Sequence, residues 1–99
     1  MDIQFQTINF KADKKLLDLI TSKLNKLQNF YDKIIDASVY LKVQKADDKE
    51  NKVIEIKLNV SNTTLFVEEK NATFENAIDL AEAAIKAQLL KYKQKTQNS

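Results

Sequence analysis

The 99-residue sequence contains no cysteine and no histidine. A chain without cysteine forms no disulfide and offers no thiolate as nucleophile or zinc ligand. A chain without histidine lacks the commonest general base and the commonest ligand of transition metals. Several acidic residues stand beside lysines, as in Asp13-Lys14 and Asp32-Lys33, which is typical of a solvated surface. We therefore expect a protein that is not an enzyme, with no catalytic residues, metal, cofactor or small-molecule substrate.

Arginine is also absent, so all sixteen basic side chains are lysines, set against fourteen acidic ones for a net charge of +2. Lysine is a compact charge that suits phosphate, whereas the planar fork of arginine suits guanine edges. The small net charge does not by itself indicate a nucleic acid partner. If the protein binds nucleic acid, we expect backbone and shape to matter more than base sequence.

No run of apolar residues approaches the length of a membrane span, and the first residues, MDIQFQ, lack the basic and apolar regions of a secretion signal. With 43% hydrophobic and 30% charged residues, the composition is that of an ordinary folded domain. A chain of this length supplies one modest core. We expect a single cytoplasmic domain over residues 1–99, with no membrane partner and a disordered polar tail at 94–99.

The clearest periodic pattern is a helix predicted over residues 74–95. Its apolar residues recur at steps of three and four and form one stripe toward a core: Phe74, Ile78, Ala81, Ile85, Leu89 and Tyr92. Acids crowd its first turns, and four lysines with no acid follow between residues 86 and 99. This gradient either stabilises the helix through its dipole or provides a basic binding surface.

The rest of the chain predicts one more helix and four strands. The predicted elements are a strand at 2–7, a helix from 14 to about 29, and strands at 38–44, 54–60 and 64–68. Asp13 and Thr73 are placed to cap the two helices. The order β-α-β-β-β-α predicts an α+β fold of two layers, a four-stranded sheet with two helices packed on one face.

Three connections carry their own signals. Residues 30–35 hold four apolar side chains and predict a packed connection: Phe30, Tyr31, Ile34 and Ile35. The turn at 46–51 is polar, and we expect it to be mobile. In the turn at 61–63, Asn62 is the residue that best tolerates a left-handed backbone in the absence of glycine.

Two segments stand out beyond these patterns: TSKLNKLQNFYDKIIDASVYLKVQK at 21–45 and AIDLAEAAIKAQLLKYKQK at 77–95. Together they resemble the ribosome hibernation promoting factor family, also called the ribosome-associated inhibitor or light-repressed family. The first is similar to the family's helix end, aromatic connection and Val-x-Leu-Lys-Val strand. The second is similar to its Ala-Ile-Asp helix, which ends in Gln-Leu-x-Lys-x-Lys-x-Lys. Leu65–Glu69 also falls where the family has a strand, so the resemblance covers nearly the whole chain.

The resemblance implies a stress or stationary-phase protein that binds the small ribosomal subunit between head and body. There it would occlude messenger RNA and the A- and P-site tRNAs, which silences translation without chemistry. Its lysines would neutralise rRNA phosphates, so affinity would fall with salt. The implied rRNA-binding residues are Lys23 and Lys26 on the first helix, Lys42 and Lys45 on a strand, and Lys86, Lys91, Tyr92, Lys93 and Lys95 on the last helix. Tyr92 either stacks on the RNA or packs within the protein.

The chain departs from the family's pattern at a few positions. Ala84 and Ala87 stand where the family commonly has a lysine and an arginine, and Leu90 stands where a polar or basic residue is usual. Thr7 replaces a glycine near the end of the first strand. Leu90 forms an apolar strip with Ala83 and Ala87 opposite the core stripe, and this strip is either a neutral exposed face or a protein contact.

Other functions stay open at this point. A double-stranded-RNA-binding domain has a similar α-β-β-β-α core, but it uses a Gly-Pro loop and lysines at the start of its last helix, where this chain is acidic. An RRM-type module needs an aromatic-rich strand that is not visible here. A protein-protein interaction module would use the open sheet face or the Leu90 strip. Because the chain ends at Ser99, it resembles the family's short form, which either silences single ribosomes or acts with a separate ribosome-dimerising factor.

Overall fold

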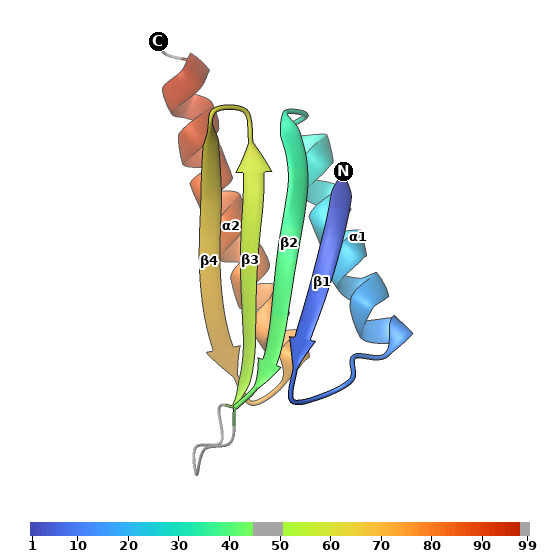
Figure 1. Ribbon diagram of the computed structural model, residues 1–99. Coiled ribbons are helices and arrows are strands. Elements are labelled where there is room, and N and C mark those ends of the chain that lie inside the picture. Colours follow the sequence, from blue (N-terminus) through green and yellow to red (C-terminus); the bar gives the residue numbers. More distant parts are fainter. Residues whose placement is uncertain (45–50, 98–99) are drawn as a thin grey trace.

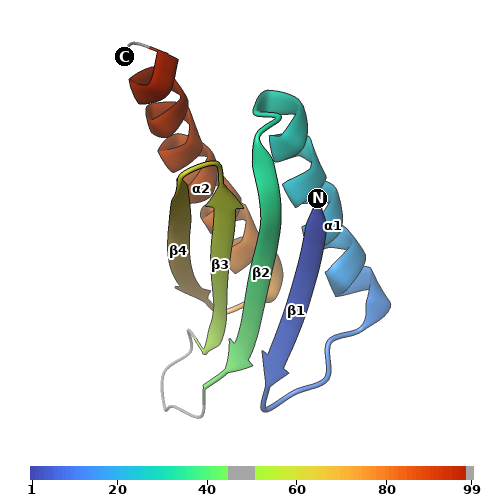
Figure 2. The ribbon, with the colours of Figure 1, turned by 45° about the horizontal axis from the view of Figure 1, so that its top comes forward.

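The computed structural model describes residues 1–44 and 51–97 (Figure 1). Its elements are β1 (Asp2–Ile8), α1 (Lys14–Phe30), β2 (Ile34–Val43), β3 (Lys52–Val60), β4 (Thr63–Asn71) and α2 (Phe74–Gln97). The strands form one sheet in the order β1-β2-β3-β4, and both helices cover the same face of it (Figures 1 and 2). The predicted two-layer α+β fold with the order β-α-β-β-β-α is confirmed.

The sheet is mixed because its connections differ. α1 carries the chain back along the sheet, so β1 pairs with β2 in parallel, while the pairs β2–β3 and β3–β4 are antiparallel. The register of β2 shifts between Ile34 and Asp36, and this irregularity leaves Ile35 60% exposed. The packed connection predicted for residues 30–35 is therefore correct for Tyr31 and Ile34, which are buried, and wrong for Ile35.

The core lies between the sheet and the two helices. Leu41, Ile54 and Leu58 project from the sheet toward the helices, and none of the three is exposed to solvent. Every member of the predicted stripe of α2 is buried, except for Tyr92, which is partly buried. No charged or polar side chain is buried within the described residues, so apolar contact alone fills this core.

Both predicted helix caps are present. The Asp13 carboxylate accepts a hydrogen bond from the Leu16 amide at 2.9 Å, and the Thr73 hydroxyl oxygen accepts one from the Asn76 amide at 3.1 Å. Each cap satisfies an amide that the first helical turn leaves without a backbone partner. The caps fix where the two helices begin, and hence which residues face the sheet.

Two asparagines in the turns adopt the left-handed backbone conformation that glycine most readily adopts. Asn62 has a φ of 73°, as predicted, and Asn9, after β1, has a φ of 67°. The side-chain amide of Asn9 donates a hydrogen bond to the Val43 carbonyl at 3.3 Å, which ties this turn to β2. The polar turn at 46–51 lies outside the described residues, except for Asn51.

α2 extends further than the sequence pattern suggested. It continues to Gln97, so residues 94–97, expected in a disordered tail, belong to the helix. Lysine and glutamine are good helix formers and prolong the backbone ladder after the apolar stripe has ended. The final lysine, Lys95, is therefore held on a helix.

Candidate nucleic-acid interface

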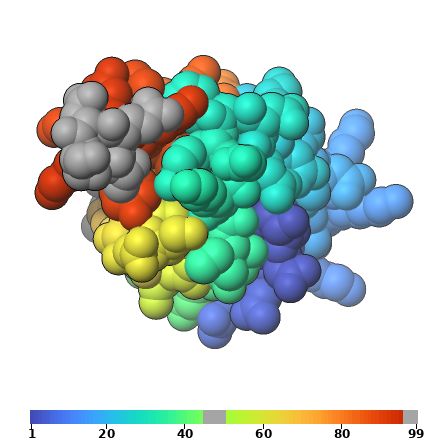
Figure 3. Space-filling model, turned by 90° about the horizontal axis from the view of Figure 1, so that it is seen from above, coloured from blue at the N-terminus to red at the C-terminus, as the bar shows by residue number. Residues whose placement is uncertain are grey.

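α1 and α2 run in the same direction, so their C-terminal ends meet at one end of the molecule (Figure 1). From above, the end of α2 lies next to the connection between α1 and β2 and next to the turn between β3 and β4 (Figure 3). The Ser61 amide donates to the Lys33 carbonyl at 3.3 Å, and the Tyr92 hydroxyl donates to the Ser61 carbonyl. These bonds join two connections and α2 into one fixed surface.

Lys86 and Lys93 are held at the seam between the helices by Phe30, the last residue of α1. Their ammonium nitrogens lie 5.6 Å and 5.1 Å from the centroid of its ring. The Lys93 ammonium also donates to the Phe30 carbonyl at 3.3 Å. A cation is favoured over an aromatic face and beside the carbonyls that end a helix. One aromatic side chain thus positions two of the predicted lysines.

Lys91 and Lys95 lie on the opposite flank of α2, next to β4. Together with Leu65, Gln88 and Tyr92 they line a shallow hollow of about 250 Å³. Gln88 donates to the Phe66 carbonyl at 2.9 Å, which ties this flank of the helix to the sheet. Both lysines are exposed, so their ammonium groups face solvent beside the hollow.

Tyr92 packs within the protein. Its ring meets the ring of Tyr31 edge to face, with centroids 6.2 Å apart and planes at 85°. Burial raises the pKa of the Tyr31 hydroxyl, and the neighbouring Tyr92 and Asp32 raise it further. Of the two roles expected for Tyr92, the structure therefore favours packing over stacking on a nucleic acid base.

Lys23 has a different environment from the other helix lysines. Its ammonium group lies 2.8 Å from the Asp79 carboxylate and 3.8 Å from the Glu82 carboxylate, both on α2. The hydrogen bond to Asp79 is the main cause that raises the pKa of Lys23, while burial acts in the opposite direction. Lys23 is thus an ion-pair contact between the two helices, and two carboxylates already neutralise its charge.

We expect the ion pair of Lys23 to give the protein a pH-dependent part of its stability. Because the folded-state pKa is raised above 10.5, this contribution is complete below that value and is lost as the pH rises through the folded-state pKa. Lys23→Met should lower the free energy of unfolding at about pH 8, and the difference from wild type should shrink by about pH 11. Urea titrations of both proteins at the two pH values measure this difference in the free energy of unfolding.

Lys26→Met is the matched control, because Lys26 is exposed on the same helix and takes part in neither of the two ion pairs of Lys23. Its free energy of unfolding should stay close to that of wild type at both pH values. If Lys23→Met lowered the free energy of unfolding by the same amount at both pH values, Lys23 would stabilise the fold through packing of its aliphatic side chain and not through its charge.

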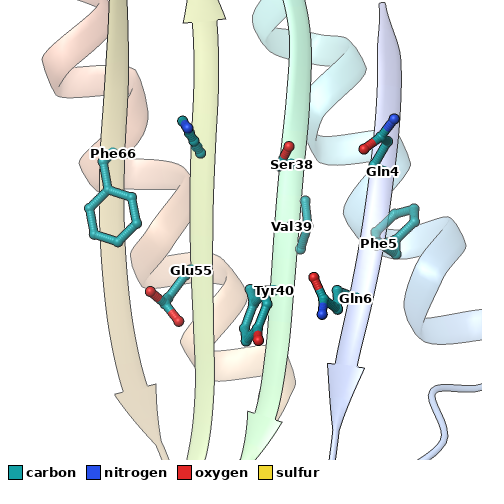
Figure 4. A pocket seen from close by; sticks show the side chains of 9 residues that line it. Gln4, Phe5, Gln6, Ser38, Val39, Tyr40, Glu55 and Phe66 are labelled. Carbon is teal, nitrogen blue, oxygen red and sulfur yellow. The ribbon is translucent and has the colours of Figure 1, made fainter.

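Lys42 lies on the other side of the sheet from the helices. Its neighbours across the strands are Ile8 and Val53, on the face that no helix covers. This open face carries a hollow of about 470 Å³, and Tyr40, Glu55 and Phe66 are among the side chains around it (Figure 4). Lys42 is therefore separated by the sheet from the lysines of α2. Lys45 lies outside the described residues.

The structure also adds a lysine that sequence reasoning missed. Lys33 is exposed in the connection between α1 and β2, and its carbonyl accepts the bond from Ser61 described above. The pairing of Asp32 with Lys33 in the sequence had suggested an ordinary solvated surface. We call six lysines, from the second halves of the two helices and from the connection after α1, the basic end: Lys26 on α1, Lys33 in the connection, and Lys86, Lys91, Lys93 and Lys95 on α2.

Other kinds of site find little support in the part of the chain that the structure describes. Within residues 1–44 and 51–97, no three acidic side chains gather in a way that would hold a metal ion. None of the described helices combines the length and the apolar character needed to cross a membrane. The basic end is the feature of this structure that most clearly favours a partner, and phosphate is the chemistry that suits it.

Comparison with known proteins identifies similar sequences. Residues 3–97 match the family described as Sigma 54 modulation protein / S30EA ribosomal protein. The chain is 32% identical over 95 residues to the ribosome hibernation promotion factor of Bacillus subtilis, and these residues are 96% of this chain and 50% of that protein. It is 31% identical over 86 residues to the protein of the same name from Deinococcus radiodurans, covering 86% of this chain and 45% of that one. The chain thus spans about half the length of the curated relatives it matches.

Solved structures share the fold. A ribosomal subunit interface protein from Coxiella burnetii superimposes with a TM-score of 0.85 at 21% identity, covering 95% of this chain and 99% of that one. The N-terminal domain of Protein Y from Thermus thermophilus gives a TM-score of 0.81 at 24% identity, with coverages of 93% and 99%. These similarities establish that the two-layer architecture is a recurrent one.

Proposed function

Because the chain belongs to the Sigma 54 modulation protein / S30EA ribosomal protein family, we propose that it is a ribosome hibernation factor. In this proposal it binds the small ribosomal subunit between head and body. There it occludes messenger RNA and the A- and P-site tRNAs, so that translation is silenced under stress or in stationary phase. It acts in the cytoplasm and performs no chemistry of its own. The names of the relatives from Bacillus subtilis and Deinococcus radiodurans support this role.

The observation that carries the proposal is the basic end. It joins lysines of α1, of α2 and of one connection on a surface that hydrogen bonds and the Phe30 ring hold in place. Phosphate groups of folded RNA are fixed in space, so the two ammonium groups that Phe30 already positions, those of Lys86 and Lys93, lose little conformational entropy when they bind phosphate. The absence of arginine suits recognition of backbone and shape.

Not all the lysines contribute equally in this proposal. Lys26, Lys91 and Lys95 are exposed and make the principal phosphate contacts, with Lys33 beside them. Lys86 and Lys93 add charge from their positions at Phe30. Lys23 stays with its two carboxylates, and Lys42 faces away from the interface.

Co-sedimentation of the protein with small subunits and whole ribosomes over a salt series tests the proposal. We expect binding at low salt and a linear fall of log affinity with log salt, with a slope of roughly −0.7 for each phosphate neutralised. Messenger RNA or tRNA should compete with the protein for the small subunit. As a control, a duplex RNA of about the same length as the competing tRNA should bind the protein much more weakly than the small subunit does. Equal binding to the duplex would favour a general double-stranded-RNA-binding domain, and binding without salt dependence would favour a protein partner.

A further inference from the structure

The outer face of α2, opposite the core, carries an apolar stripe that the basic end does not use. Leu80 and Leu90 are 46% and 43% exposed, and they are two of the four large hydrophobic side chains exposed among the described residues. Ala83 and Ala87 lie between them and are also exposed, as are Asn76 and Gln94 at the two ends. We call these six residues the outer stripe: Asn76, Leu80, Ala83, Ala87, Leu90 and Gln94.

The outer stripe has the spacing of a helix-pairing face. Its apolar members follow one another at steps of three, four and three residues, which is the a/d spacing of a heptad. Its chemistry is also symmetric about position 85: leucines at 80 and 90, alanines at 83 and 87, and carboxamides at 76 and 94. A surface that reads the same in both directions is self-complementary under a two-fold axis. The partner that fits it is a second copy of this chain.

We propose that two copies of the protein associate through their outer stripes as an antiparallel α2–α2 pair. The two-fold axis passes at the level of residue 85, so Leu80 of each copy contacts Leu90 of the other. Ala83 of each copy likewise contacts Ala87 of the other. Small side chains at the centre let the two helices approach to about 8 Å, and the leucines close the contact at both ends.

The charges of α2 determine the direction of the pair. Acidic residues lie in its first half, at Glu75 and at Asp79 and Glu82, which together carry two negative charges against the one positive charge of Lys23, and the lysines lie in its second half. An antiparallel pair brings the acidic half of each helix beside the basic half of the other, whereas a parallel pair would bring like charges together. The two helix dipoles are also opposed in the antiparallel pair. Charge and apolar symmetry therefore select the same arrangement.

The size of the contact sets its strength. One helix face from residue 76 to 94 is about 27 Å long, at 1.5 Å per residue. A single helix pair of this length buries less than the roughly 1,200 Å² of specific, stable interfaces. We therefore expect a reversible dimer with a dissociation constant between about 1 μM and 1 mM. This association does not depend on the proposed ribosomal function, and its test needs no ribosome.

Cysteine cross-linking tests the register directly, because the natural sequence has no cysteine. In the antiparallel pair, positions 80 and 90 of different copies are neighbours, while two copies of position 80 are about 15 Å apart along the helix axis. A mixture of the Leu80→Cys and Leu90→Cys proteins should thus form at least about fivefold more disulfide-linked dimer than either protein alone, since a disulfide needs Cα atoms within about 7 Å. Phe66→Cys, on the open face, sets the background level.

A second pair of variants keeps the leucines. A mixture of the Ala83→Cys and Ala87→Cys proteins should also cross-link above the Phe66→Cys background. The proposal is overturned if neither mixture exceeds that background, or if Leu80→Cys alone cross-links as well as the mixture, which would indicate a parallel pair.

Sedimentation equilibrium of the cysteine-free protein supplies an independent readout. Leu90→Glu should weaken self-association by at least about tenfold, because it places a carboxylate in the apolar contact. Adding Leu80→Lys to the Leu90→Glu protein should restore most of the lost self-association, because the new lysine of each copy then contacts the new glutamate of the other. Wild-type protein that stays monomeric up to about 1 mM would contradict the proposal. So would a double variant that associates no better than Leu90→Glu.

Discussion

Reversal of three exposed lysines of the basic end to glutamate, in the variant Lys26→Glu/Lys91→Glu/Lys95→Glu, should lower affinity for the small ribosomal subunit by about 1,000-fold or more at moderate salt. Each reversal removes a charge-assisted contact to phosphate and replaces it with repulsion. The slope of log affinity against log salt should become less steep by roughly two to three units. Co-sedimentation over a salt series measures both quantities.

The matched control carries three reversals on the open face of the sheet: Lys42→Glu, Lys57→Glu and Lys70→Glu. Each reversal changes the charge by −2, so both triple variants go from a net charge of +2 to −4. The control should keep most of its affinity, because its charges lie on the face that no helix covers. Equal loss in both variants would show that net charge, rather than the basic end, governs binding. Loss in the control alone would move the interface to the open face.

Stability should change little in either triple variant. Lys26, Lys91 and Lys95 are exposed, as are Lys57 and Lys70, and Lys42 is half-buried on the open face. Surface substitutions of this kind usually change the free energy of unfolding by about 0.5 kcal/mol or less each. Urea denaturation of both proteins separates a loss of binding from a loss of fold.

Leu89→Ala should lower the free energy of unfolding by about 2–5 kcal/mol, the largest stability effect that we expect from a single truncation on α2. Leu89 is fully buried between this helix and the sheet, so the substitution removes apolar contact and leaves a cavity. A domain of this size has a total stability on the order of 5–15 kcal/mol. The variant should therefore unfold at a much lower urea concentration than wild type.

Leu90→Ala is the control, because the same truncation at the next residue falls on the opposite side of the helix. Leu90 is 43% exposed, and its replacement should change the free energy of unfolding by no more than about 0.5 kcal/mol. The titrations are made on dilute protein, so that self-association through the outer stripe does not contribute. Similar losses in the two variants would mean that α2 is not oriented as described.

Much of the fold could be predicted from local patterns alone. The stripe of α2, the caps at Asp13 and Thr73 and the left-handed Asn62 all depend on residues a few positions apart, so the sequence contains the information that they need. The order of the elements then leaves few compatible topologies. Ile35 was mispredicted because a register shift depends on how two strands pair, which periodicity within one strand does not report.

The sequence predicted the type of residue in the candidate site, lysine, better than it predicted which lysines belong to that site. Lysines on the last helix were visible in the sequence, as was their separation from the acids at its start. The aromatic ring that positions Lys86 and Lys93 was not visible in the sequence, because Phe30 belongs to a different helix and lies 63 positions before Lys93. Lys33 was missed for the same kind of reason, since its place at the basic end follows from a contact with Ser61.

The sequence by itself determined the elements of this protein, the faces that they bury and the kind of charge on its surface. Only the tertiary structure decided the surroundings of each lysine. Lys23 and Lys26 are three residues apart on one helix, yet carboxylates from α2 neutralise Lys23, and Lys26 remains exposed. Periodicity is a property of neighbours along the chain, whereas the electrostatic state of a side chain depends on groups that folding brings within a few ångströms of it.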